Sequence, residues 1–127
     1  MTIKYTYDKS HSYVDTVVTE VASMQQVSEY INNLINNETI EDSFYELVDF
    51  TNIDNFDFGY YQTNELVDLF IKLQKHKKYL GTCVVVNSDI AKGMSHMFNI
   101  VWENKGLTLK AFNSRDDAIN FIESNVT

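Results

Sequence analysis

The sequence predicts an α/β fold in which helices cover a mixed, mostly parallel sheet. Short apolar runs alternate with helical repeats of roughly 10 to 16 residues, which favours parallel strands joined by right-handed crossovers. The predicted order of elements is ββαβαβαβα, and its two opening strands add one antiparallel pair. The 127 residues include no proline and only four glycines, with no linker-like stretch. The chain is therefore predicted to form one domain over residues 1–127.

The first elements are a predicted hairpin and a helix. Apolar and polar residues alternate over 3–8 and 13–21, and the polar turn 9–12 joins these two strands. Ser23 and Gln26 have the spacing of a capping box and begin a helix that ends at residues 36–39. The predicted buried face of this helix consists of Val27, Tyr30, Ile31, Leu34 and Ile35.

The middle of the chain predicts a strand, a loop and a second helix. The strand covers 44–50, the loop covers 51–61, and Thr63 is the predicted N-cap of the helix. The apolar face of this helix consists of Leu66, Val67, Phe70 and Leu73, with Ile71 left open.

Residues 81–127 predict strand, helix, strand and helix. Val84-Val85-Val86 is apolar on both faces and indicates an interior strand, whereas the alternating pattern of 107–113 indicates a strand nearer an edge. Ser88 and Ser114 are the predicted N-caps of the two helices, with Asp117 at the capping-box position of the last one. Gly93 lies inside the first of these helices, where we expect it to permit the close approach of a neighbouring element.

Composition excludes several classes of protein. The formal charge of −8 argues against a partner that is a nucleic acid or an anionic membrane, since both require a basic surface. No apolar run approaches the roughly 20 residues that a membrane-spanning helix needs, so no membrane insertion is expected. Cys83 is the single cysteine, which fits a reducing compartment, and the first residues carry no export or transit pattern. We expect a cytoplasmic protein.

Three segments of the chain carry a family resemblance. They are Leu47-Val-Asp-Phe-Thr-Asn-Ile, the strand, turn and helix of residues 84–98, and the strand and helix of residues 110–122. In order and spacing they resemble the fold shared by bacterial anti-sigma-factor antagonists, or STAS domains, and small SpoIIAA-like proteins. The resemblance spans about residues 14 to 124 and is closer to the SpoIIAA-like group, which is largely uncharacterised. It implies a module that binds other proteins.

One position departs from the resembled family. STAS antagonists carry a phosphorylatable serine just after an aspartate, before the helix that follows the third strand. The corresponding stretch here is Asp57-Phe58-Gly59-Tyr60, and the phenyl ring of Phe58 cannot accept phosphate. The departure argues against a phosphorylation-switched antagonist and leaves a partner surface at the same place open.

The candidate functional surface lies where strands of the predicted parallel sheet end. Ligands and partners usually meet the carboxyl ends of such strands, and we expect segments 51–62, 87–89 and 113–116 to converge there. Segment 53–61 is rich in aromatic residues, and burial over the sheet end and exposure to a partner are about equally expected for them. The predicted partner or ligand surface consists of Asp49, Asp57, Phe58, Gly59, Tyr60 and Tyr61.

No catalytic, metal-binding or cofactor-binding residues are predicted. Asp49, Asp54 and Asp57 have no known cation-loop spacing, so turn or cap roles are preferred by roughly five to one. The three histidines lack metal-ligand spacing, and the simplest role of His76 is to complement the end of its helix. Cys83 in a predicted interior strand is expected to be a buried, inert thiol. Nothing assembles a nucleophile, a base and an orienting group.

Two functional hypotheses follow from the sequence. The first is a non-catalytic protein-interaction or regulatory module, for which a homodimer is one open form. The second is a binder or carrier of a small hydrophobic, lipid-like ligand, for which the aromatic and methionine content could line a cavity. An enzyme comes third.

Overall fold

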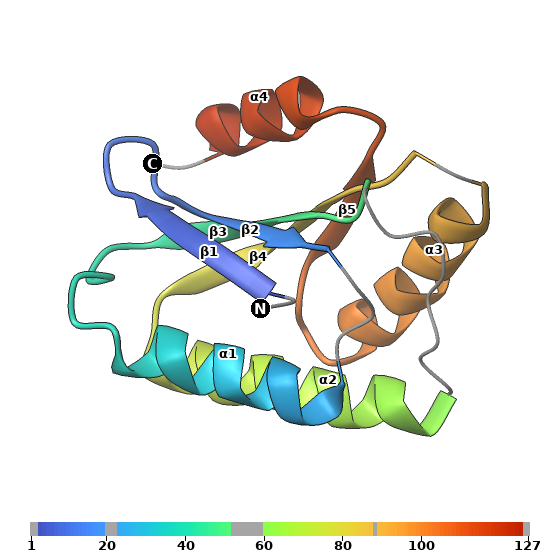
Figure 1. Cartoon of the computed structure of the whole chain (residues 1–127), viewed down its shortest axis with the longest axis horizontal. Helices are drawn as coiled ribbons and strands as arrows, with labels where there is room; N and C mark the ends of the chain where they lie inside the picture. Colours follow the sequence, from blue (N-terminus) through green and yellow to red (C-terminus); the bar gives the residue numbers. More distant parts are fainter. Residues whose placement is uncertain (1–2, 20–22, 52–59, 88, 126–127) are drawn as a thin grey trace.

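The computed structural model describes residues 3–19, 23–51, 60–87 and 89–125 of the chain; the side chains of 60–63, 90, 91, 94 and 97 lie outside this description. The described elements follow the predicted order (Figure 1). They are β1 (Ile3–Asp8), β2 (Tyr13–Val18), α1 (Met24–Asn36), β3 (Phe44–Asp49), α2 (Tyr60–His76), β4 (Tyr79–Val85), α3 (Asp89–Asn104), β5 (Leu109–Phe112) and α4 (Arg115–Asn125).

The strands form one mixed sheet in which spatial order equals sequence order, β1-β2-β3-β4-β5. The pair β1–β2 is antiparallel, and every later pair is parallel. The connections from β2 to β3, from β3 to β4 and from β4 to β5 all lead to the next strand in the same direction across the sheet. Because such crossovers share one hand, their helices α1, α2 and α3 lie on one face of the sheet. Helix α4 lies on the other face (Figure 1). The predicted α/β class and mixed sheet are confirmed, as is the edge position of β5.

Each face of the sheet has its own apolar core. Val14, Val48 and Val84 point toward α1, α2 and α3, where Trp102 is also buried in the core. Leu47, Cys83 and Val85 point toward α4. Alternate residues of each interior strand therefore contribute to opposite cores, as the pleat of a strand requires.

Two predicted helix starts are confirmed by hydrogen bonds. The Gln26 amide donates to Ser23 Oγ at 3.2 Å, and Gln26 Oε1 accepts from the Ser23 amide at 2.9 Å, which completes the capping box. At the start of α4, the Asp117 amide donates to Ser114 Oγ at 3.2 Å. The predicted cap Ser88 lies outside the described residues.

The predicted start of α2 at Thr63 is wrong. The helix begins at Tyr60, so Thr63 lies inside it. No residue from Tyr60 to Gln62 is a proline or a glycine, and none of them opposes extension of the helix by most of a turn. Tyr60 and Tyr61 therefore belong to the helix and not to the preceding loop.

The predicted role of Gly93 is also wrong. Gly93 is exposed, and a Cβ atom placed on it would meet no neighbour within 4 Å in the described structure. Close approach occurs instead at Gly81, where an added Cβ would lie 2.9 Å from Thr108 Cβ and 3.0 Å from the Thr108 carbonyl oxygen. The glycine in β4 allows the segment entering β5 to pass beside it.

Candidate functional site

Asp49 is the one residue of the predicted surface whose side chain the structure describes. It ends β3 and is largely buried. Its Oδ1 accepts hydrogen bonds from the Thr51 amide at 2.9 Å and from Thr51 Oγ1 at 2.6 Å. Asp49 therefore fixes the direction in which the chain leaves the sheet. Asp57, Phe58 and Gly59 lie outside the described residues, and Tyr60 and Tyr61 are described only as backbone in the first turn of α2.

Arg115, from the first turn of α4, bridges two strands at this end of the sheet. Its Nη2 lies 2.6 Å from Asp15 Oδ2, and its Nη1 lies 3.3 Å from Asp49 Oδ2. Asp15 is on β2 and faces the same side of the sheet as Asp49, because the two strands pair with Val17 opposite Asp49. One guanidinium thus joins β2, β3 and α4.

The surroundings of Asp49 and Arg115 shift the pKa of both side chains. Burial by itself raises the pKa of Asp49, but the hydrogen bonds from Thr51 and Arg115 outweigh it and hold that pKa below its usual value. The hydrogen bond and the charge of Asp15, with a smaller effect from Asp49, raise the pKa of Arg115. Both side chains are therefore charged at neutral pH, and the ion pair is present under ordinary conditions.

The predicted convergence of three segments is found for the parts that the structure describes. Asn87, which follows β4, donates its side-chain amide to the Thr51 carbonyl at 3.4 Å. Thr51 is tied to Asp49, and Asp49 is tied to Arg115. The carboxyl ends of β3 and β4 and the start of α4 are therefore linked into one polar cluster, which we call the strand-end cluster: Asp15, Asp49, Thr51, Asn87 and Arg115.

The strand-end cluster joins β2, β3 and α4 through hydrogen bonds and ion pairs. Both carboxylate oxygens of Asp49 already accept hydrogen bonds. Among the described residues, no three or more His, Cys, Asp or Glu side chains are placed to hold a metal ion. Nζ of Lys110, on the same side of the sheet, lies 5.0 Å from the centre of the Phe121 ring, so its charge is directed to that ring.

A serine, a histidine and an aspartate meet in the β1–β2 hairpin, but in the wrong geometry for a catalytic triad. Ser10 Oγ donates to Asp8 Oδ1 at 2.7 Å and lies 3.0 Å from His11 Nδ1. Asp8 Oδ2 lies 2.9 Å from the same nitrogen. In a triad the nucleophile and the acid contact different ring nitrogens, so this group is a turn that the Asp8 side chain stabilises.

Sequence reasoning missed a second polar group, buried beneath α1, α2 and α3. Glu46, in the middle of β3, has no exposed surface. Its Oε2 accepts a hydrogen bond from Tyr30 Oη at 2.5 Å, and its Oε1 accepts one from Thr82 Oγ1 at 2.7 Å. Thr16 Oγ1 lies 2.7 Å from Tyr30 Oη, and Tyr79 Oη contacts Thr82 Oγ1. We call these five side chains the Glu46 network.

The Glu46 network orients its hydroxyl protons toward a single carboxylate. Tyr30 and Thr82 donate to Glu46, so Thr16 must donate to Tyr30, and Tyr79 must donate to Thr82. Burial raises the pKa of Glu46 to about 7, although the hydrogen bonds from Tyr30 and Thr82 oppose that rise. Being fully buried, the carboxyl cannot reach a substrate and is a structural group that titrates near neutral pH.

The other titratable group of the sheet, Cys83, is 1 % exposed. Burial, with a smaller effect from the charge of Glu46, raises the pKa of its thiol to about 12. The predicted burial of this thiol is confirmed, and at neutral pH it is not a thiolate nucleophile. His76 Nδ1 lies 2.9 Å from the Lys72 carbonyl oxygen in the last turn of α2, which agrees with its predicted role at the helix end.

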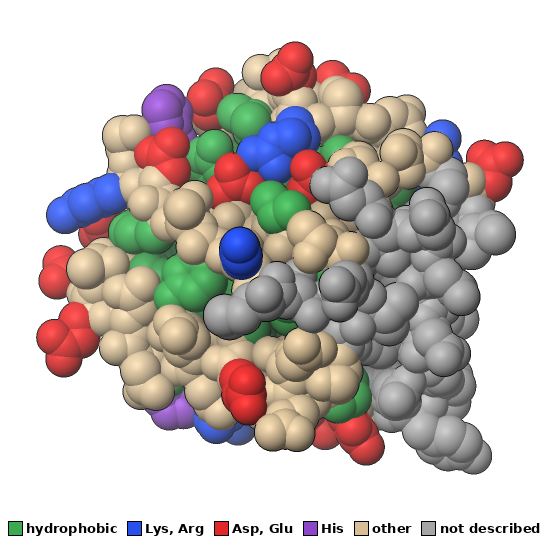
Figure 2. Space-filling model, in the orientation of Figure 1, with side chains coloured by type: hydrophobic (Ala, Val, Ile, Leu, Met, Phe, Trp, Pro, Cys, Tyr) green, Lys and Arg blue, Asp and Glu red, His purple; other side chains and the backbone are tan. Residues whose placement is uncertain are grey.

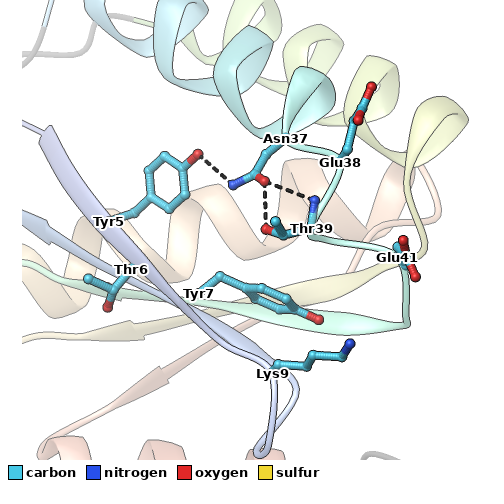
Figure 3. A pocket seen from close by; sticks show the side chains of 8 residues that line it. All are labelled: Tyr5, Thr6, Tyr7, Lys9, Asn37, Glu38, Thr39 and Glu41. Atoms are coloured by element: carbon cyan, nitrogen blue, oxygen red, sulfur yellow. Dashed lines mark hydrogen bonds between the residues drawn. The ribbon is translucent and has the colours of Figure 1, made fainter.

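A groove lies beside β1, between that strand and the segment connecting α1 with β3 (Figure 3). Its volume is about 820 Å³. Its lining is polar and aromatic: Tyr5, Thr6, Tyr7, Lys9, Asn37, Glu38, Thr39 and Glu41. This composition does not favour a lipid-like ligand, for which a hydrophobic lining would be expected. The hydrophobic-ligand hypothesis stays a prediction.

The surface agrees with the acidic composition. On the face shown in Figure 2, acidic side chains are spread over the molecule and hydrophobic ones form small groups between polar atoms. No helix among the described residues is both long and apolar enough to cross a membrane.

Comparisons with known proteins show the fold. No protein-family model matches the chain, and no curated protein matches it. Among solved structures, it is similar to an uncharacterized protein of the DUF3478 family, with a SpoIIAA-like fold, from Shewanella loihica PV-4. The TM-score is 0.63 at 15% sequence identity, over 94% of this chain and 93% of the other. The chain therefore has a SpoIIAA-like fold, as its sequence predicts.

Proposed function

We propose that this protein is a non-catalytic interaction or regulatory module that binds a protein partner at the carboxyl end of its sheet. The binding surface comprises the segment between Asp49 and α2 together with the first turn of α2. The observation that carries the proposal is the bridge that Arg115 makes from α4 to Asp15 on β2 and Asp49 on β3.

This bridge supports a binding role because it holds in place the end of β3, from which the proposed binding segment begins. The Arg115–Asp49 contact anchors the end of β3, and Asp49 in turn anchors Thr51. A surface segment that begins from a rigid base loses less conformational entropy on binding than one that begins from a mobile base.

Phe58 stands where STAS antagonists have a phosphorylatable serine, which fits a partner surface that works without phosphorylation. Phe58, Tyr60 and Tyr61 are aromatic, a class of residue enriched at the centres of protein interfaces. The high pKa of the Cys83 thiol and the complete burial of Glu46 also favour a non-catalytic module.

The test is affinity capture with surface variants. Phe58→Asp and Tyr61→Ala are each expected to reduce capture of specific partners from a lysate of the source organism by tenfold or more, as measured by quantitative mass spectrometry. The matched control is Leu80→Asp, which places the same charge on an apolar residue that is 37 % exposed and lies near the opposite end of β4. Retention of the same partners by Phe58→Asp, Tyr61→Ala and the wild type would remove the assignment of this surface.

A further inference from the structure

Strand β1 is an open edge of the sheet. It pairs with β2 on one side only, and no described strand lies on its other side. It is six residues long, whereas β5 at the other edge has four. Alternate backbone N–H and C=O groups of an edge strand have no partner in the sheet and can pair with a further strand. Short edge strands are a usual protection against such pairing, and β1 lacks that protection.

The sequence of β1 is complementary to itself when two copies run antiparallel about Thr6. Lys4 of one copy then lies opposite Asp8 of the other, Tyr5 lies opposite Tyr7, and the two Thr6 residues face each other. Opposite charges, aromatic pairs and threonine pairs are each favourable across antiparallel strands, by roughly 0.2–1 kcal/mol per pair. Each of the unlike pairs occurs twice in a symmetric dimer.

Only this register uses both charges. Shifting the centre to Tyr5 places Lys4 opposite Thr6, and shifting it to Tyr7 places Asp8 opposite Thr6. Two residues that face each other across antiparallel strands must both direct their N–H and C=O groups toward the partner strand, or both away from it. The smallest possible change of alignment therefore moves the two-fold axis by one whole residue. Lys4 and Asp8 therefore select one alignment.

The surroundings of β1 leave room for a second copy. Lys4 and Thr6 are exposed, and Thr6 lines the groove together with Tyr5 and Tyr7. Figure 3 shows the Tyr5 ring directed toward Asn37, whose side-chain amide donates to Tyr5 Oη at 3.2 Å. Tyr7 Oη is buried but has no hydrogen-bond partner among the described residues. A polar group from a second molecule at this edge would satisfy it.

We propose that the protein forms a homodimer by antiparallel pairing of β1 with β1 of a second copy. The two-fold axis passes through Thr6, and the two sheets become continuous. Tyr5 of one copy packs beside Tyr7 of the other along the groove, while the Lys4–Asp8 pairs set the register. This surface is separate from the partner surface proposed at the carboxyl end of the sheet, and neither proposal depends on the other.

Sedimentation equilibrium of the full chain tests the dimer, with a dissociation constant expected on the order of 10–100 µM for a small edge-to-edge interface. Lys4→Asp sets like charges opposite each other twice, as does Asp8→Lys, and each variant alone is expected to dimerise at least tenfold more weakly. In a heterodimer of the two variants, both Asp residues of the Lys4→Asp copy lie opposite Lys residues of the Asp8→Lys copy. An equimolar mixture is therefore expected to recover the wild-type affinity as a heterodimer.

A cross-link keeps the test independent of those charges, because Asp8→Lys also removes hairpin contacts with Ser10 and His11. Thr6→Cys is expected to give a disulfide-linked dimer with oxidised glutathione. Thr108→Cys, an exposed threonine beside the other sheet edge, is expected to stay monomeric on the same gel. Cys83 is buried and does not compete.

Two results would overturn the homodimer. One is a wild-type protein that is monomeric at several times the expected dissociation constant. The other is a dimer that Lys4→Asp does not weaken and that Thr6→Cys cross-links no faster than Thr108→Cys, since such a dimer uses another surface. Phe58→Asp should leave this dimer intact and Lys4→Asp should leave partner capture intact, so the two proposals fail separately.

Discussion

Glu46 and Asp49 lie on the same strand, and their environments shift their ionisation in opposite directions. Glu46 points toward α1, α2 and α3, is fully buried, and accepts hydrogen bonds from two hydroxyl groups of the described residues. Asp49 points toward α4 at the end of the strand and has a guanidinium beside it. The pKa of Glu46 is raised to about 7, whereas that of Asp49 is lowered.

The difference shows that depth of burial and the set of donors together decide whether a carboxyl of this strand has a raised or a lowered pKa. Two hydroxyl donors are insufficient to offset the burial of Glu46, while Thr51 and Arg115 together more than offset the partial burial of Asp49. We therefore expect Glu46 to affect the stability of the core, and Asp49 to affect the carboxyl end of the sheet, where the proposed partner binds. Three predictions separate the two roles.

The largest effect is expected from Glu46→Ala. The substitution leaves a cavity in the core and removes the acceptor for the hydroxyls of Tyr30 and Thr82, so it should lower the free energy of unfolding by about 4 kcal/mol. Urea denaturation at pH 6 measures the change. Glu46→Gln is the matched control, because it retains the volume and one acceptor, and it should cost no more than about 2 kcal/mol. Equal losses for the two variants would show that the network has no energetic role.

The second effect is a dependence of stability on pH that comes from Glu46. Its pKa is raised on folding, from 4.5 to about 7. The stabilisation is therefore fully present below the unfolded pKa and is lost as the pH rises through the folded one. The free energy of unfolding should fall by about 3 kcal/mol between pH 5 and pH 8.

Glu46→Gln should remove most of this fall, while Asp49→Asn should retain it. The pKa of Asp49 is lowered on folding, so its contribution is present at neutral pH and is lost only as the pH falls below its ordinary range near 4. Urea titrations at several pH values compare the three proteins. A slope that survives in Glu46→Gln would assign the pH dependence to another group.

The smallest effect is expected from Arg115→Met. Arg115 is about one-third exposed, so solvent screens its ion pairs, and its loss should cost about 1 kcal/mol. The pKa of Asp49 should rise, and the difference from wild type should shrink at high salt. NMR titration of the Asp49 carboxyl and urea denaturation at two salt concentrations measure both changes.

Lys110→Met is the matched control for that substitution. Lys110 also lies on the α4 side of the sheet, but it contacts the ring of Phe121 and forms no ion pair with Asp49 in the described structure. It should leave the pKa of Asp49 unchanged. If Arg115→Met also left that pKa unchanged, the bridge would not be the reason that it is low.

Local signals were sufficient to predict most elements of the fold. Ser23 and Gln26 set the start of α1 through contacts three residues apart, and the strand pattern of 84–86 reports burial on both faces. Thr63 failed as a boundary because a threonine is tolerated inside a helix, and the residues before it do not stop one. Gly93 failed because a glycine in a helix does not reveal whether anything lies beside it, whereas Gly81 meets Thr108 only through the pairing of β4 with β5.

The two polar clusters depend on contacts between distant parts of the chain. Glu46 in an otherwise apolar interior strand was a visible signal, since a carboxyl on such a strand needs buried donors. Its donor Thr82 on β4, and Thr16 on β2, which contacts Tyr30, can be placed only once β3 is known to lie between β2 and β4. Tyr30 was correctly placed on the buried face of α1, but an apolar pattern does not show where its hydroxyl bonds.

The place of the strand-end cluster was predicted, but Asp49 is its one member that was named in the predicted partner surface. Convergence of 51–62, 87–89 and 113–116 follows from the parallel topology, and Asp49, Thr51, Asn87 and Arg115 lie in or beside those segments. The bridge to Asp15 requires the register of β2 against β3, which no local pattern fixes. The surface residues from Asp57 to Tyr61 stay predictions.

The identity of spatial and sequence order in the sheet has a consequence for how the chain folds as it is synthesised. Each strand from β2 onward can join the strand made just before it, so no strand has to wait for a distant segment to emerge from the ribosome. The α4 face is completed last. Of the described strands, β1 is made first, and no later one covers its outer edge; nascent chains on the same messenger would expose that edge to one another early.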